Sequence, residues 1–294
     1  MENIDGIILI NKPKGYTSHD VVAKVKKILK ASKVGHTGTL DPNATGVLPL
    51  LINNGTKLSK YLIEHNKQYE VTLKLGIKTD TADVEGNIIE EKNINLLNYS
   101  EDDIKQILKS FIGKQEQIPP MYSALKVNGK KLYEYARNGQ TVEIQSRKIE
   151  IYDCELKSVD NKENEIQFIV SCSKGTYIRS LCEDIALKFD TVGYMKELNR
   201  IKVGKFEIKN CITIEELEIN INDEKIKKNI ITMEELLKDN ETIIIEENKL
   251  NHFLNGVKIT INKKDGIYQI YNQNKEYIGT GIVKNNLLKR DIIK

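Results

Sequence analysis

The chain has 294 residues, enough for one large domain or two ordinary ones, and its 45 lysines and arginines nearly balance its 42 acidic residues. Its longest apolar stretch, residues 47–52, contains a proline and is far shorter than a bilayer span, which excludes a membrane-spanning helix. The first residues lack the basic start and long apolar core of a secretory signal, so we expect a cytoplasmic protein that binds no membrane.

The first half of the chain predicts strands and capped helices. Residues 7–10 form an apolar strand that enters a Pro/Gly loop, and a helix begins near residue 18, where Thr17 and Asp20 have the spacing of a capping box. A glycine-rich loop follows, and then a strand at residues 69–75. A second capping box at residues 100–103 predicts a helix that ends at residue 113.

The second half changes in texture near residue 240. A buried strand is predicted at residues 166–173, a short helix at 180–187, shorter strands up to residue 212 and a last helix at 233–237. Beyond residue 240 only short strands and turns are predicted. This mixture predicts an α+β protein with a mainly antiparallel central sheet in residues 1–240, followed by a small β-rich domain in residues 241–294.

The chain has neither the cysteine spacing of a metal site nor a known nucleotide-binding motif, so its sequence does not indicate a cofactor. The four cysteines form no Cys-x-x-Cys pair, and none has a histidine at metal-binding spacing. Reduced thiols are therefore expected. The chain also lacks the phosphate-binding Gly-rich loops and the His-Glu-x-x-His pattern, so we expect chemistry without a bound cofactor or metal.

The loop at residues 35–50 is the first candidate for chemistry. Glycines and prolines punctuate ordinary loops, but they also permit the close backbone approach that a reactive site needs, and here they flank His36 and Asp41. Asp41 is the only carboxylate between Asp20 and Glu64, so a nucleophile or base in this loop must be that residue. Spacing alone leaves the structural and the functional interpretations open.

Residues 175–179 are the second candidate. In an extended segment Tyr177 and Arg179 project to the same side, while Ile178 faces the core. A surface ion pair between Arg179 and Glu183 is the alternative that spacing favours. Arginine is scarce in this chain, which keeps a more specific role for Arg179 open. It occurs only as Arg137, Arg147, Arg179, Arg200 and Arg290.

Residues 114–150 lack apolar periodicity and carry more basic than acidic side chains. Tyr122, Tyr133 and Tyr135 are interleaved with these cations. Cations that meet phosphates and rings that stack on splayed bases are typical of proteins that bind single-stranded or looped RNA. A solvated lysine face is the alternative.

Five separated motifs, in order over about residues 4–210, resemble the TruB family of tRNA pseudouridine-55 synthases. They are GIILINKPKGYTSHDVV, GHTGTLDPNATGVL, GIKTDTADVEG, IPPMYSALKVNGKKLYEYAR and CSKGTYIRSL. The stretch YIGTGIVKNNLLKRDII resembles, more weakly, the PUA-type RNA-binding domain that follows this catalytic domain. The resemblance implies the family fold, with the site in a cleft across the central sheet.

The resemblance also implies the reaction. Uracil at position 55 of the tRNA T-loop is detached from ribose, rotated and rejoined through carbon 5, without a cofactor. The base must first be flipped out of the folded T-arm. By this resemblance Asp41 is the catalytic carboxylate, Arg179 pairs with it and lowers its pKa, and Tyr69 stacks on the flipped base.

Four substrate-binding residues follow from the same resemblance. His36 holds the rearranged loop, Tyr177 borders the pocket, Leu198 forms part of its wall and Lys57 is a basic residue beside it. Residues 114–150 correspond to the insertion that closes over the T-arm of the tRNA partner. Asn199 departs from the family, which usually has an arginine there. A monomer without a protein partner is implied.

Two other functions fit parts of the sequence. A guide-RNA-dependent pseudouridine synthase shares the Gly-x-x-Gly-x-Leu-Asp-Pro motif and a C-terminal PUA domain, but it leaves the gripping of the RNA arm to partner proteins. The long insertion argues against it. A non-catalytic tRNA-binding or tRNA-folding protein would not need both Asp41 and Arg179, which are present.

Overall fold

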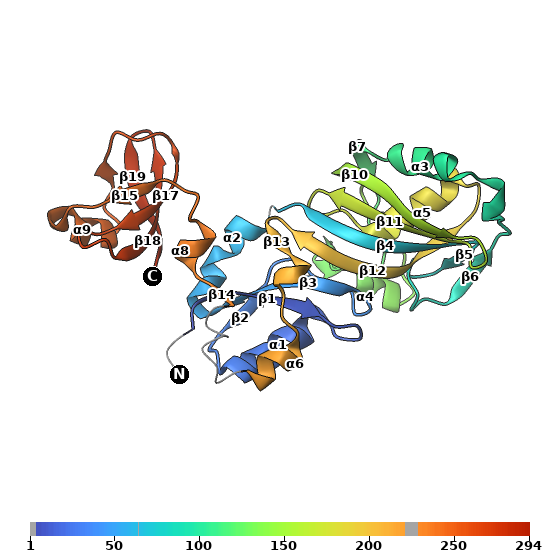
Figure 1. Ribbon diagram of the computed structural model, residues 1–294, viewed down its shortest axis with the longest axis horizontal. Coiled ribbons are helices and arrows are strands. Elements are labelled where there is room, and N and C mark those ends of the chain that lie inside the picture. The colour runs from blue at the N-terminus through green and yellow to red at the C-terminus, as the bar shows by residue number, and fades with distance from the viewer. Residues whose placement is uncertain (1–3, 64, 221–228) are drawn as a thin grey trace.

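The computed structural model describes residues 4–63, 65–220 and 229–294. Within these residues ten strands form one central sheet: β1 (Gly6–Lys12), β2 (Val34–His36), β3 (Thr45–Ile52), β4 (Lys67–Leu75), β7 (Gly113–Gln117), β10 (Arg147–Asp160), β11 (Glu165–Cys172), β12 (Gly193–Val203), β13 (Phe206–Glu207) and β14 (Ile230–Ile231). Their order is β14-β1-β3-β12-β4-β11-β10-β7, with β2 on β3 and β13 on β12 (Figure 1). Only the β3–β12 pair in this sheet is parallel, so the predicted α+β fold with a mainly antiparallel sheet is confirmed.

Two groups of helices cover the two halves of this sheet. The described helices are α1 (Ser18–Leu29), α2 (Ser59–Leu62), α3 (Glu101–Lys109), α4 (Leu132–Arg137), α5 (Ile178–Lys188), α6 (Ile214–Ile219), α8 (Met233–Leu236) and α9 (Glu247–Leu254), with 3-10 turns η1 (Asn53–Leu58), η2 (Leu96–Asn98) and η3 (Ile208–Asn210). Residues of α3 and α5 share one apolar core with β4, β10 and β11, and residues of α1 and α6 share another with β1 and β3. Strands β12 and β4 therefore lie where the two halves meet. None of the described helices is long and apolar enough to cross a membrane.

Both predicted capping boxes are present. The Thr17 hydroxyl accepts from the Asp20 amide and the Asp20 carboxylate accepts from the Thr17 amide, and Ser100 with Asp103 repeats this arrangement at α3. The prediction of shorter strands between the helix at 180–187 and residue 212 was wrong for β12, which is one strand of 11 residues, whereas β13 is short. Two register irregularities in β12 break the alternation that marks a continuous strand in sequence.

A five-stranded sheet occupies the C-terminal part of the chain. Its strands are β15 (Thr242–Ile244), β16 (Ile259–Thr260), β17 (Gly266–Tyr271), β18 (Tyr277–Lys284) and β19 (Leu287–Ile293). The prediction of a small β-rich domain is confirmed, but the expectation of strands and turns alone was wrong. Helix α9 also belongs to it and packs Leu250 and Phe253 against Tyr268 and Ile270. The boundary at residue 240 and the likeness to a PUA domain stay predictions.

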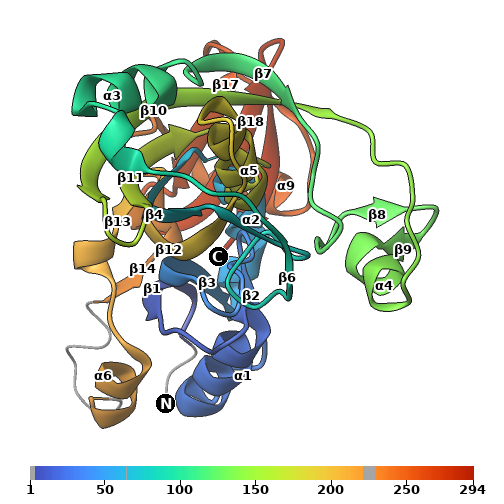
Figure 2. The ribbon, with the colours of Figure 1, turned by 90° about the vertical axis from the view of Figure 1, so that its right-hand side faces the viewer.

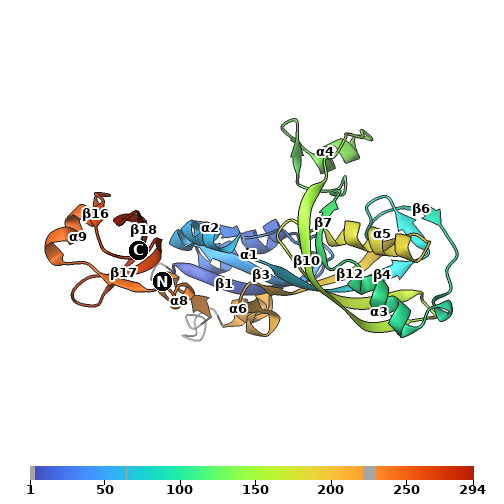
Figure 3. The same cartoon turned by 90° about the horizontal axis from the view of Figure 1, so that it is seen from above.

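The segment predicted as an insertion is narrower in the structure than residues 114–150. Its two ends belong to the central sheet, where β7 pairs with β10 and Gln117 lies opposite Arg147. The part that leaves the sheet, residues 118–146, carries the hairpin β8 (Lys126–Val127) and β9 (Lys130–Lys131) followed by α4. It projects from the body of the molecule on the side where β7 ends and β10 begins (Figures 2 and 3). We call residues 118–146 the arm.

Candidate active site

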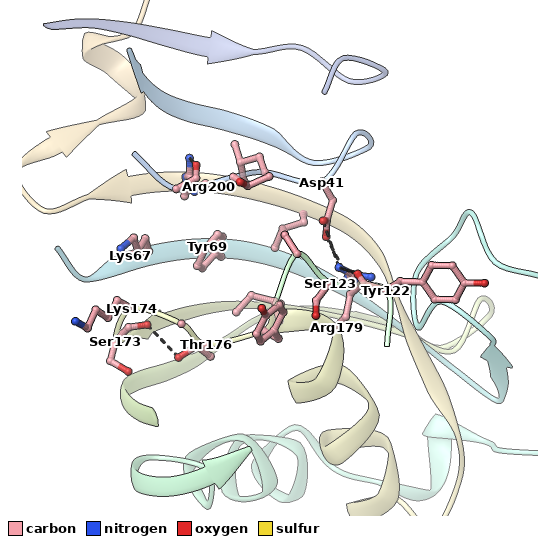
Figure 4. A pocket seen from close by; sticks show the side chains of 18 of the residues that line it. Asp41, Lys67, Tyr69, Tyr122, Ser123, Ser173, Lys174, Thr176, Arg179 and Arg200 are labelled. Carbon is pink, nitrogen blue, oxygen red and sulfur yellow. Dashed lines mark hydrogen bonds and ion pairs between the residues drawn. The ribbon is translucent and has the colours of Figure 1, made fainter. Parts of the chain in front are cut away.

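A cavity of about 900 Å³ opens over the centre of the large sheet. Its walls come from β4 and β12, from the loop before β3, from the arm and from the start of α5 (Figure 4). The lining includes five of the seven residues that the sequence analysis proposed: Asp41, Tyr69, Tyr177, Arg179 and Leu198. Segments far apart in the chain therefore meet in one site.

Asp41 and Arg179, which both line this cavity, form an ion pair (Figure 4). The Nε atom of Arg179 lies 3.1 Å from one carboxylate oxygen of Asp41, and its Nη2 donates to the other oxygen at 3.3 Å. This two-point contact fixes the plane of the carboxylate as well as its position. The Arg179 side chain is 7% exposed, whereas that of Asp41 keeps 35%, so the carboxylate remains accessible from the cavity.

Arg179 has further partners that hold it in place. Its guanidinium donates to the carbonyl oxygens of Thr81 at 3.3 Å and Tyr122 at 2.9 Å, and Nη1 lies 3.6 Å from an Asp83 carboxylate oxygen. Only a planar group with several donors can contact all of these at once. A lysine at this position would leave some of them unpaired.

The prediction of an extended segment at residues 175–179 was wrong. Tyr177 is the N-cap of α5, and Ile178 and Arg179 form its first turn, with both side chains buried. The alternative of a surface pair between Arg179 and Glu183 is not what the structure shows. Glu183 lies 3.6 Å from Lys78, and Arg179 turns toward Asp41.

Opposing effects set the pKa of the Asp41 carboxyl. Burial raises this pKa most, the nearby Asp83 raises it further, and Arg179 and Lys12 lower it. Arg179 therefore has the predicted lowering effect on this pKa, but the net direction of the shift is upward. Burial and the neighbouring Asp83 together raise the pKa of this carboxyl more than the two cations lower it.

Tyr69 lies on β4 directly opposite Arg200 on β12. Both side chains are buried, and burial raises the pKa of the Tyr69 hydroxyl more than the Arg200 guanidinium beside it lowers this pKa. Arg200 also donates to the carbonyl oxygens of Val47 at 2.8 Å and Gly38 at 3.1 Å. It thus ties the aromatic residue in the cavity to the loop that carries Asp41.

A second buried cation supports the same loop from its other end. Lys12 is fully buried, and its ammonium donates to the carbonyl oxygens of Pro13 at 3.0 Å, Tyr16 at 2.5 Å and Pro42 at 2.9 Å. Burial lowers the pKa of Lys12 to about 8, although the Asp41 carboxylate opposes this shift. Two buried cations therefore bind the loop on either side of Asp41: Lys12 at the Pro42 carbonyl and Arg200 at the Gly38 carbonyl.

The other proposed binding residues differ in their distance from the chemistry. Leu198 is 8% exposed and lines the cavity from β12. His36, on β2, does not line the cavity. Its ring packs edge-on against the ring of His19, with the two ring centroids 5.4 Å apart, and His19 does line the cavity. Lys57 lies on η1, exposed, outside the lining. The roles of these residues remain predictions.

Three site residues were missed in the sequence analysis: Lys12, Asp83 and Arg200. Lys12 carries a signal, because a lysine that ends an apolar strand just before Pro13 departs from the strand pattern. Asp83 lies inside one of the quoted motifs but has nothing nearby in sequence to mark it. Arg200 contacts Gly38 across 162 positions of the chain, which no local pattern reveals.

The arm carries cations stacked on its own tyrosines. Lys131 and Arg137 each lie 5.3 Å from the centre of the Tyr133 ring, and Lys130 lies 6.0 Å from that of Tyr135. These contacts hold positive charge on the projecting part of the molecule.

In the described part of the chain, no cluster of three or more His, Cys, Asp or Glu side chains could hold a metal ion.

Two family profiles match the chain. Residues 26–178 match the TruB family pseudouridylate synthase N-terminal domain, and residues 179–244 match the tRNA pseudouridylate synthase B C-terminal domain. In the solved structure of a Cbf5-Nop10-Gar1 complex, a chain 25% identical to this one superimposes with a TM-score of 0.71, over 100% of this chain and 84% of that chain. Together with the aspartate–arginine pair in the central cavity, these matches define a pseudouridine synthase.

The curated relatives narrow this class. The tRNA pseudouridine synthase B of Staphylococcus aureus (strain MRSA252) is 44% identical over 265 residues, which cover 89% of this chain and 87% of that protein. The enzyme of the same name from Clostridium kluyveri is 43% identical over 288 residues, 96% of each chain. The chain belongs to the TruB family.

Proposed function

We propose that this TruB-family protein converts the uridine at position 55 of the tRNA T-loop to pseudouridine, as a monomer that needs no cofactor and acts in the cytoplasm. The observation that carries the proposal is the two-point contact between Arg179 and Asp41 in a cavity also lined by Tyr69. The tRNA substrate is supported by the high identity to relatives named tRNA pseudouridine synthase B.

The site supplies what the isomerisation requires of a carboxylate. Whether Asp41 attacks the base, attacks the sugar or removes a sugar proton, it must be ionised and aimed at a flipped nucleotide. Arg179 aims it, and Lys12 and Arg179 favour its ionised form. Burial has the opposite effect and makes the carboxylate more reactive, because fewer water molecules solvate it.

The surroundings of Asp41 suit a base that has left the RNA stack. Tyr69 and Leu198 present apolar surface in the cavity, and Tyr177 borders it, so a flipped uracil can be held between side chains. In this proposal Tyr69 stacks on the base, and His36 and Lys57 act from the periphery of the cavity. Asn199 accepts a hydrogen bond from Thr45 at 3.3 Å and supplies no cation for a phosphate.

The arm supports the choice of a folded RNA substrate. It projects beside the cavity and brings Tyr122 and Ser123 into the lining, while Lys126, Lys130 and Arg137 lie farther along it. A T-arm held between the arm and the sheet would have its loop over Asp41. Positive charge on such a projection attracts the phosphate backbone.

The guide-RNA-dependent synthases are the second candidate, because the fold match to Cbf5 extends over the whole chain. The decisive experiment is to mix the purified chain with an unmodified T-arm minihelix and no other RNA or protein, and to assay pseudouridine. A minihelix with cytidine at position 55 is the control. Product at position 55 supports the proposal. Product only after a guide RNA is added supports the second candidate, and tight binding without product supports a tRNA-binding protein.

A further inference from the structure

The last residue of β7, directly before the arm, is hydrogen-bonded to Tyr177. Gln117 ends β7 and is 2% exposed. Its side-chain oxygen accepts from the Tyr177 amide at 2.8 Å, and its side-chain nitrogen donates to the Tyr177 carbonyl at 3.0 Å. One buried amide thus bonds both backbone groups of the N-cap residue of α5, whose own side chain makes no capping hydrogen bond.

The next residues of the arm continue this contact into the first turn of α5. The Ser180 hydroxyl donates to the Ile118 carbonyl at 2.9 Å, and the Arg179 guanidinium donates to the Tyr122 carbonyl at 2.9 Å. Four hydrogen bonds therefore connect residues 117–122 with residues 177–180. Every residue from 177 to 179 lines the cavity.

The other end of the arm touches the same turn. Arg147 begins β10 opposite Gln117, and its guanidinium lies over Gly175. Gly175 has a φ of +78°, and a side-chain carbon added there would lie 3.3 Å from an Arg147 nitrogen. The residues that flank the arm at its two ends, Gln117 and Arg147, therefore both lie against residues 175–177.

One nitrogen of Arg179 is shared between the arm and the catalytic carboxylate. Its Nη2 donates to the Tyr122 carbonyl at 2.9 Å and to Asp41 at 3.3 Å. A shift of Tyr122 by a few tenths of an ångström would change the balance between these two acceptors. A displacement of Tyr122 would therefore alter the contact between Arg179 and Asp41 through this shared nitrogen.

From this we infer that Gln117 is a positioning residue that couples the docking of RNA on the arm to the geometry of the Arg179–Asp41 pair. The inference rests on the proposed function, in which the arm grips the T-arm. Gln117 is not among the residues that line the cavity, and its side chain is bonded to Tyr177. Its two hydrogen bonds fix Tyr177, the N-cap of α5. Because Arg179 lies in the first turn of this helix, they also fix the position of Arg179 relative to Tyr122 of the arm.

The test uses Gln117→Met, which keeps the length of the side chain and removes both hydrogen bonds to Tyr177. The matched control is Gln115→Met on the same strand, where the glutamine is half-buried and donates to the Phe111 carbonyl at 2.8 Å, away from the site. Misplaced catalytic groups cost up to about 100-fold in rate, so kcat on the T-arm minihelix should fall about 10- to 100-fold in Gln117→Met. KM should change by less than about threefold, and the control should match wild type.

Hydrogen exchange measured with and without the minihelix separates coupling from simple loss of stability. In wild type, RNA should protect both the arm and residues 177–181. In Gln117→Met, RNA should still protect the arm but should protect residues 177–181 much less than in wild type, because two of the four hydrogen bonds are lost. Ser180→Ala, which removes a single bond of the set, should show the same pattern more weakly and serves if Gln117→Met does not fold.

The inference would be overturned if Gln117→Met and Gln115→Met had equal kcat. It would also be overturned if RNA protected residues 177–181 in Gln117→Met as strongly as in wild type. A rise in KM with kcat unchanged would do so too. Failure of the proposed function looks different, because wild type itself would then form no pseudouridine on the minihelix. The exchange experiment still reports the coupling in that case, since it needs only RNA binding.

Discussion

Replacing Arg179 by lysine keeps the positive charge and removes the planar fork. In the structure the fork contacts both oxygens of Asp41 and the carbonyls of Thr81 and Tyr122. A single ammonium that stays near Asp41 reaches neither carbonyl, and each buried acceptor left unpaired costs about 1–3 kcal/mol. Two such acceptors give about 2–6 kcal/mol, divided between lower stability and a less well-aimed carboxylate.

We expect kcat of Arg179→Lys on the T-arm minihelix to fall about 100- to 1000-fold, which corresponds to about 3–4 kcal/mol of lost transition-state stabilisation. Arg179→Met also removes the charge that opposes the raised pKa of Asp41. If, as we propose, activity needs the ionised Asp41 carboxylate, the acid limb of the kcat–pH profile of Arg179→Met should move to higher pH, whereas that of Arg179→Lys should shift less. Single-turnover rates and thermal unfolding of both variants provide the data. The reasoning is refuted if Arg179→Lys turns over within about threefold of wild type.

Three further predictions concern the buried cations and the arm. Arg200→Lys should lower the free energy of unfolding by about 2 kcal/mol in urea titrations, because one ammonium cannot serve Val47, Gly38 and Tyr69 together; an unchanged midpoint would contradict this. Lys12 titrates near pH 8 when folded and near its ordinary 10.5 when unfolded, so the folded state releases its proton first. The stability of wild type relative to Lys12→Met should therefore rise with pH between these values, and a flat difference would show that burial does not destabilise the charged form. Affinity for the minihelix should fall steeply as salt is raised, since lysines on the arm meet phosphates, and a salt-independent affinity would count against the arm as the grip.

Local features of this fold were predictable, and the reasons are visible in the residues. Thr17 with Asp20 and Ser100 with Asp103 act over three residues, so the starts of α1 and α3 could be located from sequence. Helix α9 was missed although Leu250, Phe253 and Leu254 have helical spacing, because the neighbouring short apolar runs suggested strands. The length of β12 was hidden by its two register irregularities.

The candidate site divides in the same way. Asp41 could be singled out because no other carboxylate lies near it in sequence, and the family motif added its role. The partners of Arg179 could not be found from periodicity, since they come from the loop before β3, the turn after β5 (Ile77–Thr79) and the arm. The direction of the Asp41 pKa shift needed the burial of the cavity as well as the sign of its neighbours. Such balances arise only once the chain has folded.

The central claim is that Asp41 is the group without which uridine is not isomerised. The most direct measurement compares wild type with Asp41→Asn for pseudouridine formed on the T-arm minihelix, with binding of the same RNA measured in parallel. Asparagine keeps the shape of the side chain and removes its charge, so we predict RNA binding close to that of wild type and no detectable product. Turnover near the wild-type rate in Asp41→Asn would contradict the account.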